Sequence, residues 1–161
     1  MDVRLINPFI ESVATLFNTM LGCGVQRGEV TVAHESGEPQ HLVALIGLNG
    51  PARGTVAVSL PISTSLAVAG RLLGEAPSMV NDDVADALAE IANMIAGGAK
   101  AKLSGDGKPI DLSLPTVVTG RDYQVVYPTG AVWLDVPFTC ELGSFSLRVT
   151  FEHDYVNGNR R

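Results

Sequence analysis

Three polar residues that could take part in chemistry lie at helical spacing in the middle of the sequence: Asp86, Glu90 and Asn93. Residues three apart on a helix have Cβ atoms about 5–6 Å apart, so Glu90 and Asn93 can enter the same small site on another molecule. A carboxamide is no base, but it accepts and donates hydrogen bonds at once. Orienting an attacking water in phosphoryl transfer requires such a group. The competing interpretation is an ordinary solvated helix face.

The helix that must position these side chains is predicted to begin after Asn81, a capping residue, and to run to about Leu103. On a helical wheel of about 100° per residue, its aliphatic residues gather opposite the polar ones. This apolar stripe comprises Val84, Leu88, Ile91 and Ile95. Four alanines keep the neighbouring side chains short: Ala85, Ala89, Ala92 and Ala96. Gly97 and Lys100 continue the polar face, and Gly97 leaves room for a partner's backbone.

Helices and strands come in blocks along the rest of the chain. Asn7-Pro8 predicts the start of a first long helix, which Gly22 ends. The next predicted elements are three strands in a meander, at 29–33, 42–48 and 55–60, and then a short helix that closes at Gly74. Four strands follow the second long helix, at 115–119, 123–127, 131–138 and 145–152. The expected fold class is α+β, an antiparallel sheet with the two long helices packed side by side on one face.

The sequence also predicts an internal duplication. The helical segment that contains Asn18 aligns with the one that contains Asn93, and both end in glycine. Residues 54–61 align with 130–137, since both begin with glycine, alternate apolar residues and end in proline. The matching cores, 7–61 and 82–137, predict a single pseudo-two-fold domain over 1–156, with a loose tail at 157–161.

The pattern Asp86-x3-Glu90-x2-Asn93, followed by Pro115 in the segment from Leu114 to Asp122, resembles the CheC/CheX/FliY phosphatase family and most of all its CheX branch. The resemblance covers nearly the whole chain, including the Asn7-Pro8-Phe9 opening and the duplicated layout. It implies an enzyme that removes the phosphoryl group from the aspartate of a phosphorylated response regulator of the CheY type.

The resemblance also implies what individual residues do. Asn93 would hold water in line beside the acyl phosphate, and Glu90 would pair with the active-site lysine of the receiver. Asp86 either assists this contact or merely solubilises the helix. The wider partner-binding set is Asp86, Gly97, Lys100 and Pro115. The chain needs no metal or other cofactor of its own, because the receiver supplies the aspartyl phosphate and its Mg²⁺.

The first long helix carries a degenerate counterpart of this site. Glu11 matches Asp86 and Asn18 matches Asn93, but Thr15 stands where Glu90 does. Because the anchor is missing, one working site per chain is predicted. The CheX branch also implies a homodimer through an edge strand of the sheet, which agrees with a charged fraction of only 17%.

Composition argues against several other partners. The formal charge is -6 and the basic residues are scattered, so nucleic acid and anionic membranes are not expected to bind. The sequence starts without the features of a secretory signal and has no stretch that suits a membrane span, which predicts a cytoplasmic protein.

Other chemical motifs are rejected on spacing. The glycine-rich stretches at 97–100 and 105–108 do not follow strands, as a Walker loop must. The histidines have no metal-binding spacing: His34, His41 and His153. Cys23 and Cys140 form neither a CxxC pair nor a disulfide framework, so they are predicted to be small buried hydrophobic residues.

Two alternatives to an enzyme stay open. One is a receiver-binding or flagellar-switch-like interaction module that kept the polar helix face and lost turnover. The other is a small-ligand sensor that uses the groove between the paired helices.

Overall fold

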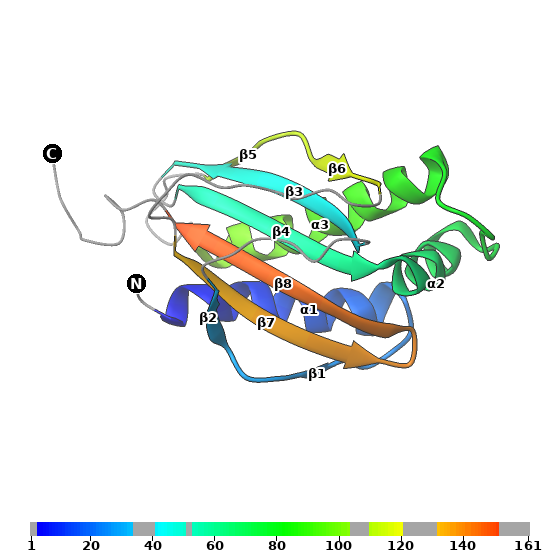
Figure 1. Cartoon of the computed structure of the whole chain (residues 1–161). Coiled ribbons are helices and arrows are strands. Elements are labelled where there is room, and N and C mark those ends of the chain that lie inside the picture. The colour runs from blue at the N-terminus through cyan, green and yellow to red at the C-terminus, as the bar shows by residue number, and fades with distance from the viewer. Residues whose placement is uncertain (1–2, 34–40, 51–52, 104–109, 121–131, 152–161) are drawn as a thin grey trace, which may run out of the picture.

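The computed structural model describes residues 3–33, 41–50, 53–103, 110–120 and 132–151 (Figure 1). A short 3₁₀ turn, Val3–Ile6, leads into the first helix. The helices are α1 (Asn7–Met20), α2 (Ile62–Leu73) and α3 (Asp82–Leu103). The strands are β1 (Gln26–Arg27), β2 (Thr31–Ala33), β3 (His41–Asn49), β4 (Gly54–Pro61), β5 (Asp111–Leu112), β6 (Thr116–Val118), β7 (Trp133–Cys140) and β8 (Gly143–Phe151).

The strands join into one sheet. Its centre consists of the four long strands in the order β7-β8-β4-β3, and each neighbouring pair is antiparallel. β1 and β2 pair with the outer edge of β7, while β5 and β6 pair with the outer edge of β3. This arrangement confirms the predicted α+β class and its antiparallel sheet.

The predicted meander is wrong at its first strand. β2 does not pair with β3 but with β7, where Val32 lies opposite Leu134. A pairing between segments so far apart in the chain leaves no local periodicity that a sequence pattern could reveal. β1 and β5 were not predicted at all, because two residues are too few to show an alternation. The strand predicted at 123–127 lies outside the described residues.

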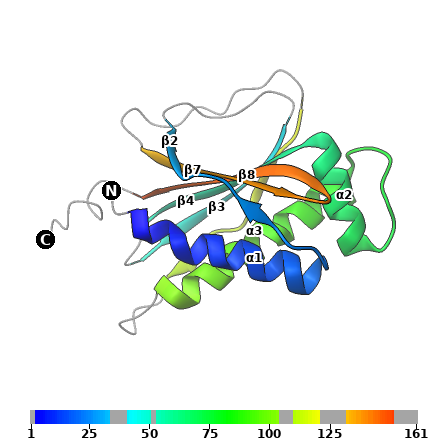
Figure 2. The same cartoon turned by 90° about the horizontal axis from the view of Figure 1, so that it is seen from below.

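α1 and α3 lie side by side on one face of the sheet and run in opposite directions, while α2 lies at the end of the sheet where β4 finishes (Figure 2). The two long helices approach closely where the Ser12 hydroxyl donates a hydrogen bond to the Ile95 carbonyl at 2.7 Å. Gly98 permits this contact, since a Cβ at that position would lie 2.3 Å from Ser12 Oγ. The Glu11 carboxylate and the Lys102 ammonium form an ion pair across the same helix pair.

The hydrophobic core fills the layer between these helices and the sheet. Alternate residues of each strand point toward the helices, as the two-residue period of a strand requires. In β8 these are Phe145, Leu147, Val149 and Phe151, all buried. Phe145 stacks on Phe17 of α1 with ring centroids 4.8 Å apart, and on Phe138 of β7 at 5.1 Å. α1 and α3 therefore each pack one face against the sheet, and the opposite face of each helix points away from the core.

The topology reads the same from both edges of the sheet. When α1 and the strands β1 to β4 are exchanged with α3 and the strands β5 to β8, the order β1-β7-β8-β4-β3-β5 is returned in reverse. This exchange matches β4 with β8 and β3 with β7. The sequence alignment sets 54–61 against 130–137 instead, so it matches β4 with the β7 region. The predicted limits of the two repeats, 7–61 and 82–137, stay a prediction. The exchange of elements favours a second repeat that continues through β8.

Candidate functional site

The first turn of α3 carries the features expected at the start of a helix. The Asn81 side-chain oxygen accepts a hydrogen bond from the Val84 backbone N–H at 3.0 Å, so Asn81 is an N-cap as predicted. Asp82 and Asp83 follow in the first turn, where the helix dipole favours negative charge. From this start, the helical period decides which side chains of α3 face the core and which do not.

The apolar stripe of α3 faces the core as the sequence predicts. Val84, Leu88, Ile91 and Ile95 are all buried. Two of the four alanines that were expected beside the polar face, Ala92 and Ala96, are buried as well. Their side chains are therefore part of the packed face, and only Ala85 and Ala89 remain half-buried beside the polar residues.

The polar residues of α3 point away from the core. Asp86, Glu90 and Asn93 are all exposed. Among the residues that the structure describes, none of these three side chains has a hydrogen-bond or ion-pair partner. A carboxylate and a carboxamide one helical turn apart are therefore both available to a second molecule. We call this surface of α3, defined by Asp86, Glu90 and Asn93, the polar face.

Gly97 extends the polar face by one turn and is half-buried. A Cβ built at Gly97 meets no described residue within 4 Å, so no contact in the part of the chain that the structure describes requires a glycine at this position. Gly98 differs, because its missing side chain makes room for Ser12. Lys100, the next predicted contact, is also half-buried.

Pro115 reaches the neighbourhood of α3 from the edge of the sheet. It is half-buried and directly precedes β6, a strand that contacts α3. The segment is fixed at Ser113, whose Oγ accepts a hydrogen bond from the Gly47 N–H at 2.7 Å. Leu114, which was not among the predicted site residues, lies between Ser113 and Pro115 and is 90% exposed. The sequence shows only a leucine before this proline, and its exposure follows from the structure alone.

The corresponding face of α1 is exposed but partly occupied. Glu11, Thr15 and Asn18 all lie on the surface. The Glu11 carboxylate is engaged with Lys102, whereas Asp86, its counterpart on α3, has no partner within the described residues. The pairing of Glu11 with Lys102 joins residues far apart in the chain, so the sequence alone gave no sign of it.

Neither a metal centre nor a membrane span is found in the described part of the chain. Those residues contain no group of three or more His, Cys, Asp or Glu side chains placed to hold a metal ion. None of the helices they form combines the length and the apolar character needed to cross a bilayer.

Comparison with known proteins gives the family. Residues 42–139, which include α3, match the family model of the chemotaxis phosphatase CheX. The chain is 33% identical over 126 residues to the CheY-P phosphatase CheX of Thermotoga maritima, across 78% of this chain and 81% of that protein.

Solved structures agree with this match. A CheC-like superfamily protein from Shewanella sp. PV-4 superposes with a TM-score of 0.84 at 28% identity, covering 94% of this chain and 99% of the other. The chemotaxis protein CheX from Desulfovibrio desulfuricans gives a TM-score of 0.83 at 25% identity, covering 93% and 100%. The chain thus belongs to the CheX family of chemotaxis phosphatases.

Proposed function

We propose that this chain is a hydrolase that removes the phosphoryl group from the active-site aspartate of a CheY-type response regulator. The observation that carries the proposal is the polar face, on which Glu90 and Asn93 lie one turn apart, exposed and without partners among the described residues. Membership of the CheX family and the 33% identity to a CheY-P phosphatase support the choice of substrate.

In the proposed reaction Asn93 positions water and performs no proton abstraction. Its carboxamide oxygen accepts a hydrogen bond from the water, while its NH₂ group can donate to the phosphoryl oxygens. The water oxygen attacks phosphorus, the bond from phosphorus to the aspartate oxygen breaks, and inorganic phosphate and the free carboxylate are released. The Mg²⁺ that such a receiver holds supplies charge neutralisation from the partner's side. This chain contributes geometry, which is the main source of acceleration in this chemistry.

Glu90 acts as the anchor. Its carboxylate pairs with a lysine of the receiver and so fixes the distance between Asn93 and the phosphorylated aspartate. Asp86, Gly97, Lys100 and Pro115 form the surrounding contact surface, and Leu114 adds an apolar contact beside Pro115. The site needs both the amide and the anchor, so the Thr15 face of α1 does not work and each chain has one site.

We further propose that the protein acts in the cytoplasm, where its phosphorylated receiver is formed, and as a homodimer. The dimer uses the edge of the sheet, and it leaves the polar face of α3 open to the receiver.

The decisive experiment follows the decay of a phosphorylated receiver with wild-type protein and with Asn93→Ala. Loss of the orienting amide should lower the assisted rate by about 10²-fold, the scale of positioning effects, and leave binding largely intact. Asn18→Ala is the matched control, because it removes an exposed asparagine from the equivalent position on α1. We expect it to keep the wild-type rate.

The same experiment decides between the enzyme and the interaction module. Acceleration by wild type and not by Asn93→Ala supports the phosphatase. If a panel of receivers bound the wild-type protein without any faster loss of phosphate, the chain would be a binding module and the proposed chemistry would be wrong.

A further inference from the structure

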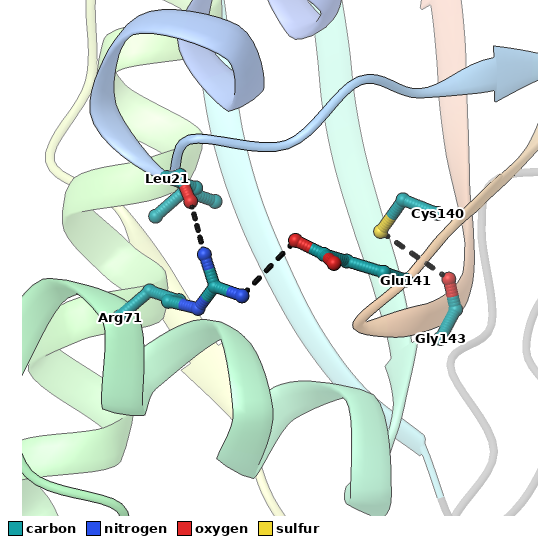
Figure 3. Close-up of polar contacts among 5 residues, drawn as sticks. All are labelled: Leu21, Arg71, Cys140, Glu141 and Gly143. Carbon is teal, nitrogen blue, oxygen red and sulfur yellow. Dashed lines mark hydrogen bonds and ion pairs between the residues drawn. The ribbon is translucent and has the colours of Figure 1, made fainter.

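The two cysteines of the chain, far apart in the sequence, meet in the fold. The thiols of Cys23 and Cys140 lie close enough together for Cys140 to help raise the pKa of Cys23. Cys140 in turn donates its S–H to the Gly143 carbonyl, with 3.5 Å between sulfur and oxygen (Figure 3). The sequence predicts two small buried hydrophobic residues, which the structure confirms for Cys23, whereas Cys140 is only half-buried. Their proximity could not be predicted, because it depends on how β1 pairs with β7.

Strand pairing brings the two cysteines together. β1 runs antiparallel to β7 with Gln26 opposite Thr139, so the chain just before β1 lies beside the end of β7. Arg71 of α2 secures both segments, since its guanidinium donates to the Leu21 carbonyl at 2.8 Å and to the Glu141 carboxylate at 3.0 Å (Figure 3). The two thiols are therefore held near each other by contacts on both sides.

The two thiols differ in access to solvent. Cys23 is 6% exposed and belongs to the hydrophobic core, whereas Cys140 is half-buried at the core's margin. A dissolved oxidant reaches Cys140 first. Cys23, whose segment is held beside that of Cys140, is then the thiol that can react with an oxidised Cys140 sulfur.

We propose that Cys140 and Cys23 are a peroxide-sensitive pair that closes into an intramolecular disulfide, with Cys140 oxidised first and Cys23 as the resolving thiol. The bond would join the segment that leaves α1 to the turn between β7 and β8.

The chemistry balances with hydrogen peroxide as the oxidant. The Cys140 thiolate attacks one peroxide oxygen, the O–O bond breaks, and after protonation one water leaves while Cys140 becomes a sulfenic acid. The Cys23 sulfur then attacks the Cys140 sulfur, the S–O bond breaks, and a second water leaves. The two thiols lose two protons and two electrons in all, and one peroxide takes them up to become two waters.

Burial makes the second step slow. It is the main cause that raises the pKa of Cys23 to about 11, and the neighbouring Cys140 raises it further, so little Cys23 thiolate exists near neutral pH. Sulfenic acid on Cys140 should therefore accumulate before the disulfide forms.

The test treats the whole folded protein with excess hydrogen peroxide and follows free thiols and intact mass. We expect the thiol count to fall from two to none and the mass to drop by two hydrogens in the monomer, with full reversal by dithiothreitol. Peptide mapping should place the bond between Cys23 and Cys140. The oxidised protein should also unfold at a higher temperature than the reduced protein, because the cross-link restricts the unfolded chain.

Two variants test which cysteine is oxidised first and which one resolves the sulfenic acid. Cys23→Ala should stop at a Cys140 sulfenic acid, which dimedone traps. Cys140→Ala should leave a single thiol that reacts at least about tenfold more slowly than Cys140 does, because Cys23 is buried.

Either of two results would overturn the proposal. One is that both thiols survive peroxide in the native protein under conditions that oxidise the urea-unfolded protein. The other is that only disulfides between two chains form.

Discussion

An exposed asparagine lies at the equivalent position of each long helix, but the residue one turn before it differs. Asn93 and Asn18 are both exposed asparagines, but Asn93 follows a glutamate by one turn and Asn18 follows a threonine. An amide can orient water only when the helix is held against the phosphorylated group, so the residue three positions earlier decides whether the amide is useful. The two helix faces therefore differ in having Glu90 or Thr15, and not in the asparagine.

This argument predicts the effect of Glu90→Thr, which copies the α1 pattern onto α3. Loss of a carboxylate that pairs with a receiver lysine should weaken binding by roughly 2 kcal/mol or more, which is at least about 30-fold in affinity. The substitution should therefore raise KM far more than it lowers kcat, unlike Asn93→Ala. Steady-state phosphate release over a range of receiver concentrations measures both constants. A wild-type KM for Glu90→Thr would exclude the anchor role.

Single-residue environments were predictable only where they follow from the helical period. The wheel placed Glu90 and Asn93 on the surface and Ile91 in the core, and the structure agrees. The pairing of Glu11 with Lys102 and the proximity of Cys23 to Cys140 were not predictable, because each depends on how distant segments pack.

At the scale of elements, α3 is a platform whose two adjacent glycines do opposite things. Gly98 faces Ser12 of α1 and is needed for the approach of the helices, while a Cβ at Gly97 would meet none of the described residues within 4 Å. A glycine in a helix interior costs roughly 0.5–1 kcal/mol relative to alanine. At Gly97 the helix loses this stability although no packing contact with the described residues requires a glycine. This agrees with the proposed role of Gly97 in contacting the receiver.

Gly97→Ala should therefore stabilise the protein and impair its reaction. We expect the free energy of unfolding to rise by roughly 0.5–1 kcal/mol, from the helix propensity of alanine. The rate with phosphorylated receiver should fall, because a methyl group is added where the partner's backbone approaches. Urea unfolding and phosphate release measure the two effects on the same preparation. An unchanged rate at higher stability would remove Gly97 from the docking surface.

Gly98→Ala serves as the neighbouring contrast and should destabilise the fold. The new methyl would displace Ser12, whose hydroxyl then loses its hydrogen bond to the Ile95 carbonyl. Loss of such a bond costs about 1 kcal/mol, and the forced separation of α1 from α3 adds to it. Ser12→Ala should relieve part of this cost in the double variant, so the two substitutions should not be additive in urea unfolding. Strict additivity would mean that the helix contact is not the cause.

The elements themselves were predicted well where they are long and periodic. α1, α3, β4 and β8 appear close to their predicted limits, because their apolar residues recur at a clear period. β2 was found but assigned to the wrong neighbour, since strand propensity says nothing about which edge a strand joins. The alignment of the two repeats stays a prediction.

At the scale of the whole molecule, the pseudo-symmetric sheet gives the two long helices equivalent packing positions on one hydrophobic core. The exchange of α1 and β1 to β4 with α3 and β5 to β8 leaves the sheet order unchanged, and both helices bury an apolar stripe against it. A site can then be lost from one helix without loss of the fold, because its polar face contributes little to the core. Under the function proposed here, the Thr15 face of α1 is such a lost site, and α1 still packs its apolar stripe against the sheet.

The stability of the whole molecule should fall at alkaline pH because of Cys23. Burial and the neighbouring Cys140 raise the pKa of this thiol from 9.0 to about 11 in the folded protein. Between these values the folded state keeps a proton that the unfolded state has lost, so the free energy of unfolding decreases as pH rises from about 9 to 11. Below that interval the contribution is fully present.

Urea unfolding at a series of pH values under reducing conditions measures this loss. Groups such as Lys and Tyr also titrate in this range, so the informative quantity is the difference between the wild type and Cys23→Ala. We expect the wild type to lose more stability across the interval than the variant, which keeps Cys140, Arg71 and Glu141 in place. Equal losses in the two proteins would show that the buried thiol is not held in its protonated form by the fold.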